Sequence, residues 1–467
     1  MGAAELARPD ELAAACPAYA LRVVRALESA GWEAWVVGGW VRDALRGVRG
    51  HDVDVTTSAP WQETERVLAS AGIEVHETGT RHGTVTAVVD GRPVETTTYR
   101  VEGSYSDHRH PDEVRFVTDV REDLARRDFT INAMAWHPDR GLLDPFGGAD
   151  DLLGRTIRAV GDPARRFDED ALRVLRAVRF ACRMGFSIEP ATQRALVASA
   201  GGLAGIAQER IGQELDGIVR SGRAGWALMA EPEVMCAAIP ELQDSWGFDQ
   251  NSPFHVYDVL EHTAHVCCAC EAFTAGLASP QLRWAALLHD VAKPATYSED
   301  VTGRGHFFGH PKAGARMSAQ ILRRLAIPGE VAVPATLLVR YHDHVVLPTR
   351  RSMLRTLQKF THACPGREVP LTYDLLDLKR ADAVSKSPKV AGYAHELDEM
   401  AVALRRALAS HAAFKVSQLE VDGADVMRLR GIPAGPGVGM VLESLVTCVV
   451  DGDVPNDREA ELRWLEL

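Results

Sequence analysis

Two adjacent glycines, Gly38 and Gly39, constrain the fold of this chain more than any other feature of its sequence. They stand between an apolar run at 35–37 and an amphipathic stretch at 41–45, which predicts a strand, a glycine turn and a helix. A second short strand carrying Asp52 and Asp54 follows. Glycine lets backbone N–H groups approach a phosphate, and a helix N-terminus adds partial positive charge. We therefore expect a surface that binds nucleotide phosphates.

Asp52 and Asp54 are the candidate metal ligands. Residues i and i+2 of a strand point to the same face, so both carboxylates would face one divalent ion. The alternative is a solvated strand or turn, and only the nearby glycine turn argues against it. Glu95 lies on a strand that returns from the turn signal at 90–93. It is either a third acid near the pair or an exposed strand glutamate.

Composition describes a folded, soluble protein of about three domains, with 467 residues, 46% hydrophobic and 25% charged. No segment resembles a signal peptide or a membrane span, so we expect a cytoplasmic protein. The net charge of −12 argues mildly against a nucleic-acid partner, although it does not describe local patches. The first lysine is Lys293, and every earlier cation except histidine is arginine, which suits phosphates and base edges.

Strand-like and helix-like patterns divide the chain. Between about residues 36 and 145, β-branched runs alternate with helical patterns, which predicts a mixed α/β region. After residue 163 helical periodicity dominates, with Leu172, Leu175 and Val178 on one buried face. Cys267 and Cys270 have C-x-x-C spacing without a second pair, so buried reduced thiols are favoured over a zinc site.

A dense polar segment at 126–133 combines two arginines, an acid, a hydroxyl and an amide. Such a segment is suited to hold a triphosphate and to sense a ribose, with Arg127 in direct contact. The alternative is a plain helix start capped by Asp128 and Thr130.

Asp170, Arg173, Arg176 and Arg179 follow at steps of three. On a helix each step turns the side chain back by about 60°, so neighbours can share a ligand. A carboxylate and an arginine match the amine donor and ring-nitrogen acceptor of cytosine and adenine, and oppose uracil and guanine. Asp170 and Arg173 would thus select CTP and ATP, with the later arginines turned toward phosphates or RNA. The alternative is a surface helix with i,i+3 salt bridges.

Histidines and aspartates in the helical half predict a second metal site with nitrogen and oxygen ligands. The fragment at 284–294 places an adjacent His-Asp pair at the end of an apolar helix. The candidate ligands are His262, His289, Asp290, His310, His342 and Asp382.

In this order, the motifs resemble the bacterial class II tRNA nucleotidyltransferase and poly(A) polymerase family with a C-terminal HD domain. Gly-Gly-Trp-Val-Arg-Asp with Asp52 and Asp54 matches the metal motif of the family, and residues 126–133 match its ribose-side motif. Residues 169–173 match the nucleotide-template motif, and 209–214 resemble the motif that steadies the template helix. The nucleotide-binding residues that this implies are Gly38, Gly39, Arg42, Arg127, Asp170, Arg173, Arg176 and Arg179.

The resemblance implies an α+β nucleotidyltransferase head of the polymerase-β-like type with a small mixed sheet, followed by all-α domains. The expected domains are the head at 1–150, a neck at 151–248, an HD domain at 249–390 and a tail at 391–467. The segment 105–114 resembles the flexible loop of enzymes that add C, C and A to tRNA. Poly(A) polymerase or A-adding activity is the alternative within the family. Residues 431–439 weakly resemble a helix-hairpin-helix turn that contacts RNA, or are a plain interhelix loop.

The expected reaction is two-metal nucleotidyl transfer, with tRNA as acceptor and CTP and ATP as substrates. Asp52 and Asp54 hold two Mg²⁺ ions, one activating the tRNA 3′-hydroxyl and one binding the triphosphate, and Glu95 assists. The HD site would bind a divalent transition metal or Mg²⁺ and act on RNA 3′ ends or nucleotides, or only support RNA binding. The rival hypotheses make HD phosphohydrolysis the main activity, or make the chain a catalytically silent RNA-binding protein.

Overall fold

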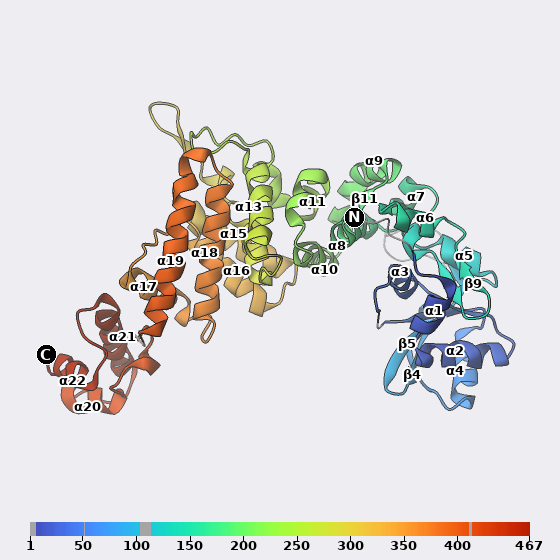
Figure 1. The fold of residues 1–467 in the computed structure, drawn as a ribbon, viewed down its shortest axis with the longest axis horizontal. Coiled ribbons are helices and arrows are strands. Elements are labelled where there is room, and N and C mark those ends of the chain that lie inside the picture. Colours follow the sequence, from blue (N-terminus) through green and yellow to red (C-terminus); the bar gives the residue numbers. More distant parts are fainter. Residues whose placement is uncertain (1–5, 51, 103–113, 411–412) are drawn as a thin grey trace. The chain divides into compact units, whose positions relative to one another are not determined.

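The computed structural model describes residues 6–50, 52–102, 114–410 and 413–467, without the side chains of residues 9, 390, 391 and 394. The chain forms two compact units, Met1–Leu215 and Asp216–Leu467, each described by itself (Figure 1). Within the described residues, no helix is long and apolar enough to cross a membrane.

A seven-stranded sheet forms the centre of the first unit, in the order β3-β4-β5-β2-β1-β8-β9. Strands β2 and β5 pair in parallel and the other neighbours are antiparallel, which confirms the small mixed sheet. The strands are β1 (Ala34–Val37), β2 (Asp54–Thr57), β3 (Glu74–Gly79), β4 (Thr84–Val89), β5 (Arg92–Thr98), β8 (Ala135–His137) and β9 (Gly141–Leu143).

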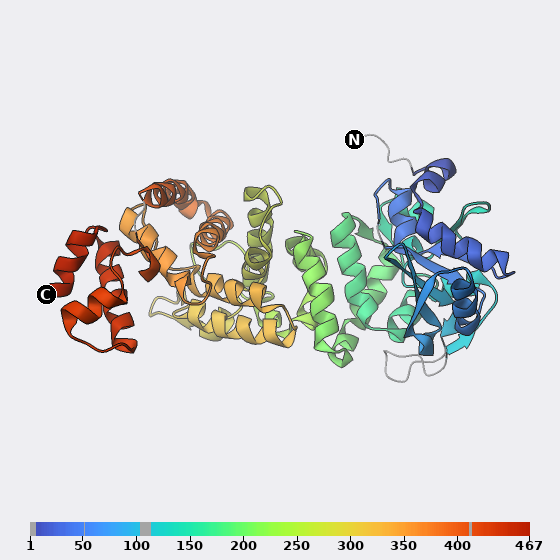
Figure 2. The same ribbon diagram turned by 90° about the horizontal axis from the view of Figure 1, so that it is seen from below.

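The predicted hairpin joins β4 to β5 through Asp90 and Gly91, whose φ angles are +53° and +74°. Positive φ at both turn residues matches the right-handed twist of the flanking strands. Helices α2 (Ala18–Ser29) and α4 (Trp61–Ser70) pack on the sheet, as the blue helices beside the blue strands show (Figure 2). Trp35 and Val37 of β1 pack instead with α5 (Val120–Ala125).

Helices complete the first unit and place the arginine-rich segment beside the sheet domain. Leu172, Leu175 and Val178 are buried on α8 (Leu172–Met184), as predicted. Two short strands, β10 (Thr156–Ile157) and β11 (Ser187–Ile188), pair in parallel, and β6 (Arg100–Glu102) pairs with β7 (Val114–Phe116). The remaining helices are α1 (Pro9–Ala15), α3 (Gly39–Leu45), α6 (Gly148–Leu153), α7 (Pro163–Glu169), α8 (Leu172–Met184), α9 (Pro190–Ser199) and α10 (Gln208–Arg220), which runs across the unit boundary.

Among the described residues of the second unit, the strands are those of one hairpin, β12 (Ser298–Glu299) with β13 (Gly305–His306), so this unit is mostly helical, as expected. Helices α13 (Val259–Phe273), α14 (Pro280–Leu288) and α18 (Glu368–Val384) contact one another. Helix α16 (Gly329–Tyr341) contacts α14 and α18, and α18 runs beside α19 (Ala391–Ala409) (Figure 1). The subdivision into neck, HD and tail domains stays a prediction. The helices are α11 (Ala224–Ala230), α12 (Pro232–Ala238), α13 (Val259–Phe273), α14 (Pro280–Leu288), α15 (His310–Arg324), α16 (Gly329–Tyr341), α17 (Arg350–Thr361), α18 (Glu368–Val384), α19 (Ala391–Ala409), α20 (Gly423–Arg430), α21 (Pro436–Asp451) and α22 (Arg458–Glu466).

Candidate functional site

Three carboxylates gather at the central strands β5 and β2 of the head sheet. The parallel register of β2 and β5 pairs Asp54 with Glu95. Strand β2 begins at Asp54, so Asp52 lies just before the strand rather than on it. Val53 and Val55 are buried, whereas Asp52 and Asp54 are more exposed, and that both carboxylates hold one ion stays a prediction. Burial raises the pKa of Asp54, and the charges of Glu95 and Asp52 raise it further, whereas Arg127 opposes them. The crowding of like charges favours a bound cation here.

Gly38 lets Arg127 approach this acid group. Its φ is +74°, and a Cβ at this position would lie 3.0 Å from Arg127 Nη1 and 3.6 Å from Asp54 Oδ2. Any larger residue would therefore displace the guanidinium as well as strain the backbone. Arg127 Nη1 donates to the Asn132 carbonyl at 3.4 Å, and Arg42 Nη1 donates to Asn132 Oδ1 at 2.8 Å. Asn132, the amide of the polar segment at 126–133, thus contacts both arginines.

Asp128 joins the polar segment at 126–133 to α8. Its Oδ2 accepts from Arg176 Nε at 2.9 Å and Nη2 at 2.6 Å, and its Oδ1 accepts from Asn132 Nδ2 at 3.1 Å. Burial alone would favour the neutral acid, but Arg176 lowers the pKa of Asp128 to about 2. Asp128 is therefore a buried carboxylate that orients Arg176.

Arg173, Arg176 and Arg179 lie on α8 as predicted, but Asp170 lies outside this helix. Asp170 ends α7, and its Oδ1 accepts from the Leu172 backbone N–H at 3.0 Å. Its Oδ2 accepts from Arg210 at 3.3 Å, whereas Arg173 Nη1 donates to Glu169 at 2.7 Å. The i,i+3 salt bridge that the alternative requires is thus not formed between these two residues.

Helix α10 contacts Arg176 and Arg179 of α8 and also Asp170. Arg179 Nε donates to Glu214 Oε2 at 2.5 Å, and Arg176 Nη1 lies 3.8 Å from Glu214 Oε1. Arg210 on the same helix holds Asp170. Residues 209–214 therefore contact both Asp170, the acid predicted to read the base, and the arginines of α8.

Phe180 lies among three of these arginines, and the sequence did not reveal its place. The ring is 5% exposed. Its centroid is 5.3 Å from Arg42 Cζ, 5.7 Å from Arg176 Cζ and 4.5 Å from Arg179 Cζ. An aromatic face attracts guanidinium groups without neutralising them. The ring thus packs against three guanidinium groups, each of which also pairs with a carboxylate: Arg42 with Asp43, Arg176 with Asp128 and Arg179 with Glu214.

The second unit brings all six predicted histidine and aspartate ligands into one buried cluster. His262 Nε2 lies 3.1 Å from Asp382 Oδ1 and 3.4 Å from His289 Nε2, and His310 Nε2 lies 3.2 Å from His342 Nε2. Asp290 lies between these pairs. Its Oδ2 is 3.1 Å from His289 and 3.5 Å from His262, and its Oδ1 is 3.5 Å from His310 and 3.6 Å from His342.

Backbone carbonyls fix the orientation of the four histidines. The Nδ1 atoms of His262, His289, His310 and His342 lie 2.7 to 3.2 Å from the carbonyls of Ser385, Ala286, Phe307 and Val339. A proton on each Nδ1 leaves each Nε2 with a lone pair directed into the cluster. This arrangement is typical of histidines that bind a metal.

Two lysines balance the acids of this cluster, and the sequence did not point to their role. Lys293 Nζ lies 2.7 Å from Asp290 Oδ2, and Lys386 Nζ lies 2.5 Å from Asp382 Oδ2. Burial favours the neutral acids, but His289 and Lys293 hold the pKa of Asp290 well below its usual range. The first lysine of an arginine-rich chain, three residues after a candidate ligand, was a usable signal for Lys293.

Two other groups of side chains that could bind a metal lie outside the two predicted sites: His137 with Glu28, and Cys267 with Cys270. His137 Nδ1 accepts from the Asp139 N–H, and its Nε2 lies 2.9 Å from Glu28 Oε2. Cys267 and Cys270 are buried on α13, and burial raises the pKa of both thiols, which agrees with the predicted inert cysteines.

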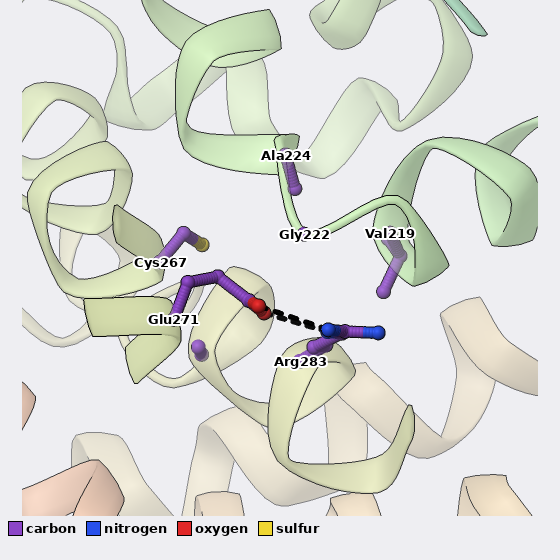
Figure 3. Close-up of a pocket in the computed structure, with 7 residues that line it drawn as sticks. Val219, Gly222, Ala224, Cys267, Glu271 and Arg283 are labelled. Carbon is purple, nitrogen blue, oxygen red and sulfur yellow. Dashed lines mark hydrogen bonds and ion pairs between the residues drawn. The ribbon is translucent and has the colours of Figure 1, made fainter. Parts of the chain in front are cut away.

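A small cavity lies beside the Glu271–Arg283 ion pair (Figure 3). Its volume of about 10 Å³ is no more than one water requires. It contains none of the predicted site residues.

Comparisons with known proteins match this architecture. Residues 34–158 match the poly A polymerase head domain, 185–245 the probable RNA and SrmB-binding site of polymerase A, and 259–386 the HD domain. The CCA-adding enzyme of Geobacillus thermodenitrificans is 32% identical over 450 residues, 96% of each chain. The A-adding tRNA nucleotidyltransferase of Deinococcus radiodurans is 35% identical over 454 residues, 93% of this chain and 96% of its own.

A solved structure, the Bacillus stearothermophilus CCA-adding enzyme in complex with CTP, aligns with a TM-score of 0.69 and 29% identity over 96% of both chains. Fold and site together define a nucleotidyltransferase with a poly A polymerase head and an HD domain. The similarity over almost the whole chain then places it in one family. The chain belongs to the tRNA nucleotidyltransferase family of the CCA-adding and A-adding enzymes. The loop at 105–114, on which the choice of product rests, lies almost entirely outside the described residues.

Proposed function

We propose that this enzyme adds C, C and A to the 3′ end of tRNA, using CTP and ATP and releasing pyrophosphate. The observation that carries the proposal is the full-length similarity to CCA-adding enzymes, on a chain whose head holds acids and arginines in the matching motifs. The A-adding relative is about as similar, so incorporation of CTP is the deciding property.

The residues of the first unit have separate tasks in this proposal. Arg42 and Arg127, both held by Asn132, bind the triphosphate beside the acids. Asp170 and Arg173 read the Watson–Crick edge of the incoming base. Arg173 donates to Glu169 and to the Arg166 and Arg126 carbonyls, which fixes the guanidinium and leaves further N–H donors for a base.

Asp52 and Asp54, with Glu95 beside them, are the residues that would hold Mg²⁺. The raised pKa of Asp54 fits this role, because crowded carboxylates are relieved by a cation. Carboxylate oxygens are the ligands that Mg²⁺ prefers. Bound Mg²⁺ would supply charge stabilisation to the triphosphate.

Incubation of the protein with labelled CTP, ATP or UTP and a tRNA that lacks its last three nucleotides tests this proposal. We expect C, C and A in the sequenced product ends, no comparable UTP incorporation, and loss of all incorporation in Asp52→Ala. Addition of A alone would reassign the enzyme to A-adding activity. UTP incorporation at the rate of CTP would refute base reading by Asp170 and Arg173.

We propose metal-dependent phosphohydrolysis by the HD domain as a second activity. It is supported by two ligand sets that share Asp290, one with His262 and His289 and one with His310 and His342. Neither oxygen of Asp290 accepts a well-formed hydrogen bond, and imidazole ligands suit a transition metal. Hydrolysis of nucleoside 2′,3′-cyclic phosphates with added Mn²⁺ or Ni²⁺ should be detectable, and His289→Ala should abolish it.

The cytoplasmic location also stays a prediction.

A further inference from the structure

Two exposed aromatic rings lie beside the histidine and aspartate cluster of the HD domain, which we call the HD cluster. Phe254 is 39% exposed and Phe308 is 78% exposed. Phe308 precedes the candidate ligand His310 by two residues, so at most about 7 Å separates their Cα atoms. An exposed aromatic ring gains free energy when a flat apolar ligand covers it. The two rings are therefore candidates to hold a ligand whose reacting group lies at the cluster.

The loop before α13 connects Phe254 to the HD cluster. The next residue, His255, has its ring centroid 5.3 Å from that of His262, with the two rings at 87°. Within the described chain, the buried Nδ1 of His255 has no hydrogen-bond partner. The Phe254 carbonyl accepts from the Ser387 N–H at 2.8 Å, five residues after the candidate ligand Asp382. Backbone contacts thus fix Phe254 next to the cluster.

The β12–β13 hairpin packs on this loop through Gly305. The Gly305 N–H donates to the Asn251 carbonyl at 2.9 Å, and Asn251 Nδ2 donates to the Gly303 carbonyl. A Cβ at Gly305 would overlap the Gln250 carbonyl and the Tyr297 ring, so only glycine permits this close approach. The loop and the hairpin therefore form one surface.

Strand β13 and the residue before it contact both aromatic rings. Arg304 Cζ lies 5.0 Å from the ring centroid of Phe254. His306 stacks on Phe308, with centroids 5.2 Å apart and an interplanar angle of 7°, and Asp300 Oδ2 lies 2.8 Å from His306 Nε2. A ring that is stacked on one side and still largely exposed offers its other side to a planar ligand.

Arg304 is the cation of this surface. Among the described residues, its buried Nε has no hydrogen-bond partner, and no carboxylate lies within salt-bridge distance of its guanidinium. The ring of Phe254 attracts this guanidinium without neutralising it. The acid of the hairpin, Asp300, instead bonds to His306 and to Thr302. Arg304 is therefore available to pair with a phosphate.

We propose that this surface binds the last nucleoside of an RNA 3′ end whose terminal phosphate lies at the HD cluster. The base stacks on Phe308, and Arg304 pairs with the phosphate on the 5′ side of that nucleoside. The proposal rests on the phosphohydrolysis assigned above to the HD domain. An aromatic ring beside an unpaired arginine is the combination that binds single-stranded nucleic acid. A free cyclic nucleotide has no second phosphate for Arg304, so the arginine favours the end of an RNA chain.

Hydrolysis of three 2′,3′-cyclic phosphates by the full-length protein with added Mn²⁺ tests the proposal. The substrates are an adenosine dinucleotide with a 2′,3′-cyclic end, adenosine 2′,3′-cyclic phosphate, and methyl riboside 2′,3′-cyclic phosphate, which has no base. Phe308→Ala should raise the KM for both adenosine substrates about 10-fold, the loss expected for one stacked base, and leave the KM for the methyl riboside unchanged. Arg304→Gln should raise the KM for the dinucleotide alone, by about 5-fold.

Binding of the same dinucleotide with a 3′-phosphate, measured by calorimetry in EDTA, gives a readout that needs no metal. The Kd should rise about 10-fold in Phe308→Ala and return to the wild-type value in Phe308→Trp. Leu277→Ala is the matched control, because Leu277 is another exposed apolar side chain of the second unit. It should change neither the KM nor the Kd.

Equal KM changes for all three substrates, or an unchanged Kd in Phe308→Ala, would overturn the nucleoside site. An effect of Phe308→Ala without any effect of Arg304→Gln would overturn the RNA end as ligand and favour a free cyclic nucleotide. Wild-type protein that binds the dinucleotide through Phe308 but hydrolyses none of the three substrates would overturn the proposed phosphohydrolysis and retain the nucleoside site.

Discussion

The head site and the HD cluster are both candidate metal centres, yet they are built in opposite ways. The head gathers carboxylates at the central strands of its sheet, where Asp52 and Glu95 are exposed. The HD cluster gathers four imidazoles and two carboxylates, each at most 9% exposed. An open oxygen site suits Mg²⁺ and a large substrate, whereas a closed nitrogen and oxygen site suits a transition metal and a small reacting group.

The largest expected effect separates the two sites. Asp54→Asn should reduce nucleotide incorporation by about 1,000-fold, because several kcal/mol of charge stabilisation disappears with the cation. The same variant should retain phosphohydrolysis. Asp290→Asn should do the reverse, with both activities measured on one preparation. Loss of both activities in either variant would contradict two independent centres.

The next effect tests base reading. Arg173→Ala should reduce the preference for CTP over UTP by about 10- to 100-fold, since one matched polar contact to a base edge contributes about 1–3 kcal/mol. Competing incorporation of the two nucleotides measures this ratio. Arg183→Ala, an exposed arginine on the same helix, should leave the ratio unchanged.

A smaller effect is expected from Phe180, whose ring packs against Arg42, Arg176 and Arg179. Phe180→Leu removes the aromatic face and should raise the KM for CTP and ATP about 5-fold with little change in kcat, a loss of about 1 kcal/mol. Phe180→Tyr should restore the KM. Phe186→Leu is the control, because Phe186 is also buried and Arg46 lies 5.6 Å from its ring, outside the site. Equal KM changes in both leucine variants would assign Phe180 a purely structural role.

The smallest effect concerns Asp377 on α18, which lies in the HD region but outside its cluster. Burial, and then Asp374, raise the pKa of Asp377 to about 6. An acid with a raised folded-state pKa is better protonated in the native state, so stability declines as pH rises from about 4 to 6. Asp377→Asn should therefore stabilise the protein by about 1 kcal/mol at pH 7.5, after discounting for solvent screening, and have little effect at pH 4. Chemical unfolding at both pH values measures this difference.

The local sequence predicted secondary structure where one hydrophobic period dominated a segment, two residues for a strand or 3.6 for a helix. The run at 84–89 became β4 with alternating burial, and Leu172, Leu175 and Val178 became the buried face of α8. Prediction was weaker at element boundaries. Asp52 falls before β2 and Asp170 falls before α8, because chain direction at an end depends on capping and neighbours rather than on periodicity.

The sequence by itself determined which residue types are available to bind metal and nucleotide. These are acids after a glycine turn, arginines on one helix, and histidines in apolar helices. Only the tertiary structure decided their partners. Asp128 meets Arg176 48 residues away, and His262 meets Asp382 across 120 residues. The surroundings of Phe180 and the pairing of Arg351 and Arg355 with Asp451 likewise depend on helices distant in the chain. Spacing along a chain specifies local geometry, but a contact between distant segments is set by the packing of whole elements.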